Sequence, residues 1–238
     1  MSGSCSYRPG VTGNILGVLK APGAIPGYAY ESLPGVAITN ERKAALILGE
    51  IIVSEGSWVG VNVALNGAGR FLHYCGVGVK ANPVAWVAAL AVAALYVAYS
   101  SRIPSVRDSL LRLDGLKVLA IGVGIFAGCC EEAVFRKALM EHGSHVGWSV
   151  VVQVAASALA FGAVHAIWGV LRLNWRAAAG AMAATGSLGL LLAMVYLLGG
   201  RNVAPCILSH ALINFFAEPG LILSALRGEM GKTFPGNR

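Results

Sequence analysis

Charged residues are scarce in this sequence of 238 amino acids. Asp, Glu, Lys and Arg together make up 12% of the chain, whereas 56% of it is hydrophobic and the mean hydropathy is +0.69. An average soluble domain has about a quarter charged residues, so the composition excludes an ordinary soluble domain and indicates a protein embedded in a membrane. The length allows roughly six spans of about 20 residues each, with short connections between them.

Acidic residues are fewer than basic ones, 11 against 18, which leaves a formal net charge of +7. In a soluble protein this charge would favour a nucleic-acid partner, but here the basic residues form no continuous patch. They lie mostly in alternate connections between apolar segments and in both terminal segments. Because connections rich in Lys and Arg face the cytoplasm, we expect an integral protein of the inner or plasma membrane with both termini cytoplasmic, and no nucleic-acid partner.

Several motifs that would define a chemistry are missing. The five cysteines match neither a disulfide framework nor a zinc-binding Cys-x-x-Cys pair. There is no His-Glu-x-x-His helix, and no Ser or Cys is paired with a base in a known motif, which argues against a covalent nucleophile. The N-terminal segment has no basic stretch followed by a continuous apolar run, so no cleavable signal peptide is expected.

The apolar segments that are present predict an all-α fold, a polytopic transmembrane helical bundle. Residues 1–43 are expected to form a flexible N-terminal tail, residues 44–227 the transmembrane domain, and residues 228–238 a short basic tail. Glu50 and Glu55 interrupt the first apolar segment, for which we predict a span with Glu50 facing the bundle rather than an interfacial helix. The six predicted spans are about 44–65, 83–99, 118–140, 146–164, 177–200, and a last one from 202 to 220 or shortly after.

Polar side chains recur at helical spacing inside three of these apolar segments. Ionisable groups at membrane depth are costly and mark function by default. Residues four apart share one face of a helix, so Glu132 is expected to pair with Arg136, while Glu131 is rotated by about 100° and faces a cavity. The three groups are Glu131, Glu132 and Arg136; Phe161 and His165; His210 and Asn214.

In this order, the three groups resemble the CPBP family of intramembrane endopeptidases, which includes the type II CAAX prenyl endopeptidases and the Abi proteins. The resemblance covers residues 116–217. It implies a peptidase in which Glu131, as general base, and His165 activate a water molecule. His210 and Asn214 would stabilise the oxyanion. The implied partners are membrane lipid and a peptide or protein substrate, with or without a lipid modification.

The other residues of these groups have supporting roles under the same resemblance. Glu132 and Arg136 would hold the geometry of the site, and the structural alternative is a buried ion pair that only fixes the helix register. Phe161 is expected to be a packing residue.

Three alternatives stay open at this point. Glu131, His165 and His210 can be arranged as three zinc ligands with an open position, although no cofactor is otherwise expected. A non-enzymatic accessory or immunity protein can share the same scaffold. A proton-coupled transporter would use the same carboxylate and histidines as a proton relay, but we find no internal repeat of the kind that transporters show.

The predicted helix lengths conflict with a shared water molecule. From a turn at His142–His145, Glu131 would lie about 18 Å along one helix and His165 about 33 Å along the next, at about 1.5 Å per residue. Straight antiparallel helices would keep the two apart, so we predict an unwound or kinked region near residues 143–148. A separation above about 10 Å would exclude their joint action on one water, because both must reach it with a hydrogen bond.

Overall fold

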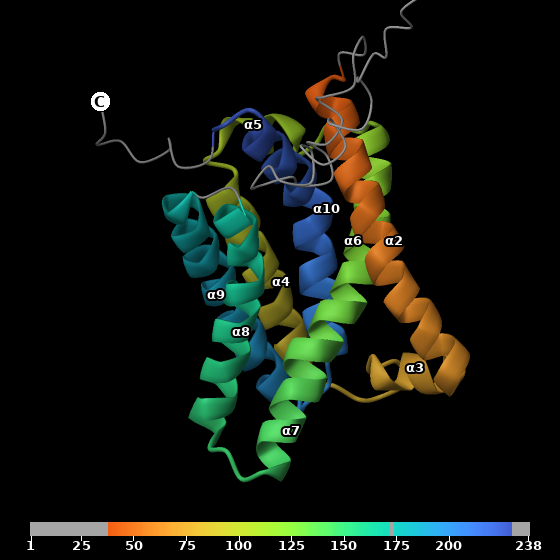
Figure 1. The fold of residues 1–238 in the computed structure, drawn as a ribbon. Coiled ribbons are helices and arrows are strands. Elements are labelled where there is room, and N and C mark those ends of the chain that lie inside the picture. The colour runs from red at the N-terminus through yellow and green to blue at the C-terminus, as the bar shows by residue number, and fades with distance from the viewer. Residues whose placement is uncertain (1–37, 172–173, 230–238) are drawn as a thin grey trace, which may run out of the picture.

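The structure, a computed structural model, describes residues 38–171 and 174–229, and the regular elements in these ranges are all helices (Figure 1). Six helical segments are long and apolar enough to cross a membrane, which confirms the predicted fold class. They are α2 (Asn40–Asn66), α4 (Pro83–Ser100), the continuous run of α6 (Gly115–Glu132), η2 (Ala133–Ala138) and α7 (Leu139–His145), α8 (Val150–Leu171), α9 (Trp175–Leu198) and α10 (Ala204–Leu226).

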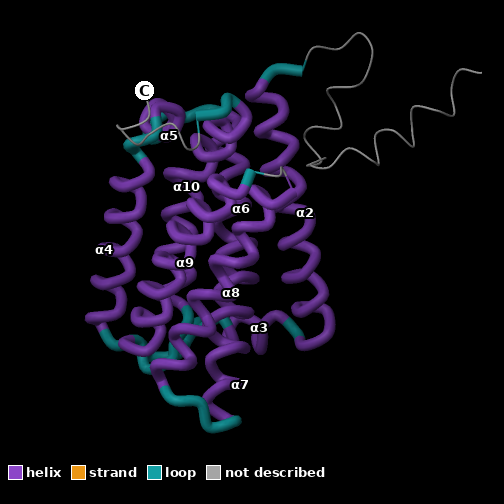
Figure 2. The backbone as a smooth tube through the Cα atoms, turned by 60° about the vertical axis from the view of Figure 1, so that its left-hand side comes forward, coloured by secondary structure: helices purple, strands orange, loops and turns teal. Residues whose placement is uncertain are grey.

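Two short helices, α3 (Ala68–Tyr74) and α5 (Pro104–Ser109), lie toward opposite ends of the bundle (Figure 2). The predicted tails fall mostly outside the described residues. Within them, α2 begins at Asn40, before the predicted start of the domain at residue 44. Thr39 caps this helix, because its hydroxyl oxygen accepts a hydrogen bond from the backbone N–H of Arg42.

α10 is the most buried of the six spans and packs against α2, α4, α5, α6 and α9. Two glycines of α6 allow its close approach. A Cβ atom at Gly124 would lie 2.9 Å from the carbonyl oxygen of Ala211, and one at Gly128 would lie 3.4 Å from that of Ile207. Small residues four apart let helix backbones come together in this way, so polar side chains of α6 and α10 can meet directly.

α8 and α9 form a second close pair for the same reason. A Cβ atom at Gly162 would lie 2.8 Å from the carbonyl oxygen of Met182, and one at Gly189 would lie 3.2 Å from Cβ of Phe161. Phe161 is almost completely buried in the hydrophobic core between α4, α8, α9 and α10. This burial agrees with its predicted packing role.

α2 is the least buried span and leans away from α6 toward its C-terminal end (Figure 1). Its length and hydropathy suit a membrane span. The orientation predicted for Glu50 was wrong, because this side chain is exposed. The buried face of the helix includes Lys43, Ala44 and Leu48, and Glu50 lies about 200° around the axis from Leu48.

The turn between the third and fourth spans lies later than predicted. The third span continues as a helix to His145, and α8 begins at Val150, so the prediction of a turn at residues 142–145 was wrong. Glu131 therefore lies about 21 Å from the end of one helix and His165 about 23 Å from the start of the next. These two distances along the helices are nearly equal, so antiparallel helices can bring Glu131 and His165 to the same level.

The predicted irregularity near residues 143–148 is limited to a short connection, in which Gly147 has a φ of 81°. The larger irregularity lies earlier, where η2 forms a π-helix directly after Glu132. Its N–H groups bond five residues back, as Leu139 N does with the carbonyl oxygen of Val134. A π-turn accommodates an extra residue in a helix and is frequent at functional sites, so it changes the directions of the side chains around the two glutamates.

The last span passes through Pro219 without ending. Proline has no N–H group and leaves the carbonyl oxygen four residues earlier, that of Phe215, without its helical partner. Lys117 replaces that partner: its buried Nζ donates to the carbonyl oxygens of Phe215, at 2.7 Å, and Phe216, at 3.0 Å. This side chain joins the start of α6 to α10 one residue beyond Asn214.

Candidate active site

The predicted site residues of the third, fourth and sixth spans come together inside the bundle. Oε2 of Glu131, near the end of α6, lies 3.7 Å from Nε2 of His165 on α8. The same carboxylate oxygen lies 4.0 Å from Nε2 of His210 on α10. These separations are too long for direct hydrogen bonds, but a water molecule lying beside such a pair can hydrogen-bond to both atoms.

Glu132 occupies a different environment from its neighbour. Its side chain is completely buried, and Oε1 accepts hydrogen bonds from Nη1 of Arg136, at 3.1 Å, and from Nδ1 of His210, at 2.8 Å. The carboxylate thus links its own helix to α10. Because Nδ1 of His210 donates here, the neutral ring presents a lone pair at Nε2, and Nε2 carries a proton only in the imidazolium form.

Arg136 is also completely buried, and three groups hold its guanidinium. Besides Glu132, Nη2 donates to the carbonyl oxygen of Gly189 on α9, at 3.3 Å. The guanidinium carbon lies 4.4 Å from the centre of the Phe161 ring, a cation–π contact. The positive charge of Arg136 therefore stabilises Glu132 while three helices, α6, α8 and α9, are connected through it.

His165 is oriented by its own helix. Its Nδ1 lies 2.8 Å from the carbonyl oxygen of Phe161, one turn earlier, and a carbonyl oxygen can only accept a hydrogen bond. In the neutral ring the proton is therefore on Nδ1, and Nε2 is free to accept a proton on the side that faces Glu131. The ring of Phe161 also packs against His165 and His210, at centroid distances of 4.6 and 5.9 Å.

Asn214 lies one turn beyond His210 on α10 and is buried, and its side chain forms no hydrogen bond with another described residue. Four buried side-chain atoms of α6, η2 and α10 have no hydrogen-bond partner among the described residues: Oε2 of Glu131, Oε2 of Glu132, Nε of Arg136 and Oγ of Ser209. Buried polar groups are usually paired, and leaving one unpaired costs about 1–3 kcal/mol. Such a concentration of unsatisfied atoms is typical of a site that binds a polar ligand.

Glu218 is a further polar residue of α10 that was not among the predicted site residues. This residue follows His210 and Asn214 at the same spacing of four, which places all three on one face of α10. The repeated spacing was a signal available in the sequence, but Pro219 had suggested that the helix was already ending there.

The residues of the zinc alternative, Glu131, His165 and His210, also lie together. Within residues 38–171 and 174–229, however, no group of three or more His, Cys, Asp or Glu side chains has an arrangement that could hold a metal ion. A site that works without a metal ion and a site that binds zinc both stay predictions.

A comparison with protein families identifies the segment that carries this site. Residues 114–216 match the family described as type II CAAX prenyl endopeptidase Rce1-like. The match begins just before α6, ends within α10, and includes all seven residues of the three polar groups. No curated protein and no solved structure matches the chain.

Proposed function

We propose that this protein is an intramembrane endopeptidase, from the premise that residues 114–216 match the type II CAAX prenyl endopeptidase Rce1-like family. In this proposal a water molecule held by Glu131 and His165 attacks the peptide bond. The observation that supports it best is the position of the Glu131 carboxylate, 3.7 Å from His165 Nε2 and 4.0 Å from His210 Nε2. One water can hydrogen-bond to both members of a pair at such a separation.

The proposed reaction begins with proton transfer from the water to the Glu131 carboxylate, while His165 Nε2 accepts a second hydrogen bond from that water. The water oxygen attacks the carbonyl carbon and forms a tetrahedral intermediate. Glu131 then gives its proton to the amide nitrogen as the C–N bond breaks. The products are a carboxylate and an amine, and no covalent enzyme intermediate is formed.

His210 and Asn214 are the proposed donors to the oxyanion. Asn214 offers an amide N–H group that no other described residue uses. His210 can donate from Nε2 only as an imidazolium, because its Nδ1 proton is given to Glu132. The Glu132 carboxylate supplies the negative charge that stabilises this imidazolium. In this proposal Glu132 therefore supports catalysis as well as the register of its helix. Donors placed where charge develops in the transition state are typically worth a factor of 10²–10³ in rate.

The first substrates to test follow from the family description. A prenylated CAAX peptide and the same peptide without its prenyl group would show whether the lipid is recognised. A comparison of whole-membrane proteomes between cells with wild-type protein and cells with Glu131→Gln would find substrates of other kinds. A product seen only with the wild type supports the proposal, whereas identical proteomes favour an accessory protein on the same scaffold.

The decisive experiment measures peptide cleavage by the purified protein in liposomes. Glu131→Gln keeps the size of the side chain but removes the base, so we expect kcat to fall by roughly 10²-fold or more. Glu50→Gln is the matched control, because Glu50 is a glutamate of a membrane-length helix that is exposed outside the site. Full activity of Glu131→Gln would overturn the proposal.

A further inference from the structure

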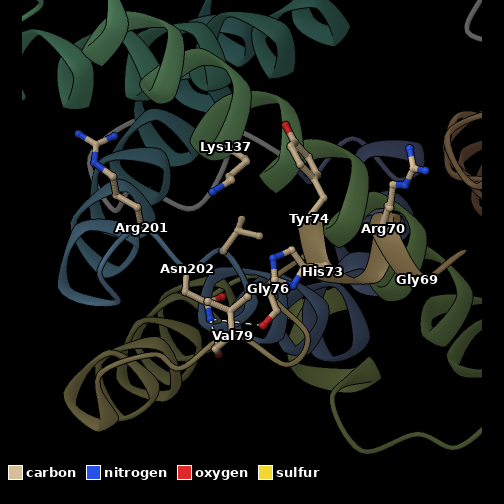
Figure 3. A pocket seen from close by; sticks show the side chains of 10 residues that line it. Gly69, Arg70, His73, Tyr74, Gly76, Val79, Lys137, Arg201 and Asn202 are labelled. Carbon is tan, nitrogen blue, oxygen red and sulfur yellow. Dashed lines mark hydrogen bonds between the residues drawn. The ribbon is translucent and has the colours of Figure 1, made fainter. Parts of the chain in front are cut away.

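A cavity with a volume of about 550 Å³ lies outside the candidate active site. Its walls come from α3, η2 and the connection between α9 and α10 (Figure 3). None of the seven residues of the polar groups lines it. Its polar lining includes Arg70, His73, Tyr74, Lys137, Arg201 and Asn202.

The wall of this pocket is fixed by Asn202. Its buried side chain donates hydrogen bonds to the carbonyl oxygens of Gly76, at 3.3 Å, and Val79, at 2.8 Å, and accepts one from the N–H of Ala204. Gly76 has a φ of 86°, and a Cβ atom there would overlap Oδ1 of Asn202. Only glycine fits this approach, so the loop after α3 is held firmly against the start of α10.

The opposite wall is the π-helix. The hydroxyl of Tyr74 donates a long hydrogen bond, 3.5 Å, to the carbonyl oxygen of Ala133. Burial raises the pKa of Tyr74, so its phenol stays neutral at physiological pH. The pocket is therefore formed before any ligand binds, with a neutral phenol in its wall.

The charge of the lining is positive. Arg70, Lys137 and Arg201 line the pocket, and no acidic residue does. Arg201 is held by Glu141, at 3.4 Å, and by Gln153, at 2.8 Å. Arg70 and Lys137 form no ion pair with any residue of the described ranges. Figure 3 shows the amino group of Lys137 and the ring of His73 pointing toward the middle, whereas the guanidinium groups of Arg70 and Arg201 point outward on opposite sides. Such a lining fits an anion with several acceptor oxygens.

The surroundings of the pocket are apolar and face outward. Leu72 on α3 is 48% exposed, and Val77 and Val79 in the following loop are 55% and 40% exposed. α3 lies at the end of α2 and crosses the direction of the spans (Figure 1). Exposed apolar side chains beside cations at the end of membrane-length helices are typical of the membrane interface, where headgroup and acyl chain meet the protein together.

We propose that this pocket binds the phosphate group of an anionic phospholipid, with Lys137 contacting the phosphate, Arg70 adding positive charge beside it, and the acyl chains lying over Leu72, Val77 and Val79. A soluble anion would gain from the cations but not from the apolar rim. The carboxylate of a peptide would likewise bind the cations without contacting the apolar rim. The two parts of the site together therefore favour a lipid.

The test uses the full-length protein in nanodiscs of phosphatidylcholine with increasing phosphatidylglycerol, and measures by native mass spectrometry which lipid stays bound. We expect wild-type protein to retain phosphatidylglycerol selectively, and the double variant Arg70→Gln/Lys137→Gln to bind it roughly 30-fold more weakly. The matched control, Arg102→Gln/Arg107→Gln, removes two charges near α5 and should bind as the wild type does.

Two further arms make each outcome decisive. Lys137→Arg keeps the charge and should keep the lipid, and the amount of folded, monodisperse double variant shows whether weaker binding reflects unfolding. Equal loss in the pocket variant and the control would overturn the proposal. Displacement of the lipid by inorganic phosphate or by a short peptide acid at equal concentration would also overturn it, because the apolar rim would then contribute nothing.

Discussion

Glu132 and His210 are 78 residues apart in the chain and share a hydrogen bond of 2.8 Å between Oε1 and Nδ1. The bond lies where Gly124 and Gly128 allow α6 to approach α10. Because only Glu132 forms this bond, the two adjacent glutamates, Glu131 and Glu132, have different proposed functions. Glu132 is completely buried and satisfied on one oxygen by two donors, whereas Glu131 is partly exposed and faces two imidazoles without touching them.

The ion pair of Glu132 should matter separately for stability and for catalysis. Glu132→Gln leaves the buried guanidinium of Arg136 without its counter-charge, so we expect the free energy of unfolding to fall by about 3–5 kcal/mol. The double variant Glu132→Gln/Arg136→Met removes both charges and should recover most of that loss in denaturant unfolding. Its peptidase activity should stay low, because His210 still lacks its carboxylate. Recovery of activity together with stability would show that the pair only fixes the helix register.

The contact between α6 and α10 should be sensitive to a single methyl group. Gly124→Ala would place a Cβ atom 2.9 Å from the carbonyl oxygen of Ala211, and we expect a loss of about 1–3 kcal/mol in stability. Gly60→Ala, on the outer side of α2 with no atom within 4 Å, is the control and should be neutral or slightly stabilising. Thermal unfolding in detergent measures both. Equal melting temperatures for the two variants would contradict the close contact.

Lys117 should support the helix around Pro219. Replacing it by Met keeps most of the apolar stem but leaves the carbonyl oxygens of Phe215 and Phe216 without this donor, so we expect a loss of about 1–3 kcal/mol. Because Asn214 is the adjacent residue, kcat should fall as well. Lys80→Met changes an exposed lysine in the same way and serves as the control. An unchanged melting temperature and kcat in the Lys117 variant would rule out this supporting role.

The proposed mechanism needs no metal ion. Protein purified without added zinc should contain far less than one metal ion per chain in elemental analysis, and its activity should survive a strong chelator. Loss of activity with the chelator, followed by recovery on adding zinc, would instead identify Glu131, His165 and His210 as ligands. In that case Asn214→Ala would be expected to leave zinc content unchanged.

Features that depend on neighbours in the chain could be predicted well. Hydropathy alone located all six spans, since about 20 apolar residues in succession are enough to cross a membrane. The pairing of Glu132 with Arg136 followed from a spacing of four residues. The boundaries were less accurate around residues 141–145, because polar residues there suggested a turn although the helix simply continues beyond the apolar stretch.

Contacts between distant segments had no comparable signal. Nothing in the local pattern indicated that Arg136 would bond the carbonyl oxygen of Gly189, or that Glu132 would hold Nδ1 of His210. The π-helix after Glu132 was equally hidden, because its wider turn depends on packing against other helices rather than on residue type.

The sequence by itself therefore determined the membrane class, the six helices and the residues that carry the candidate chemistry. Tertiary structure decided which nitrogen of each histidine faces Glu131, how the two glutamates differ, and that a basic pocket forms beside α3. The physical reason is the range of the interactions. Helix formation and membrane insertion depend on residues within one segment, whereas proton positions and pockets depend on side chains that only folding brings together.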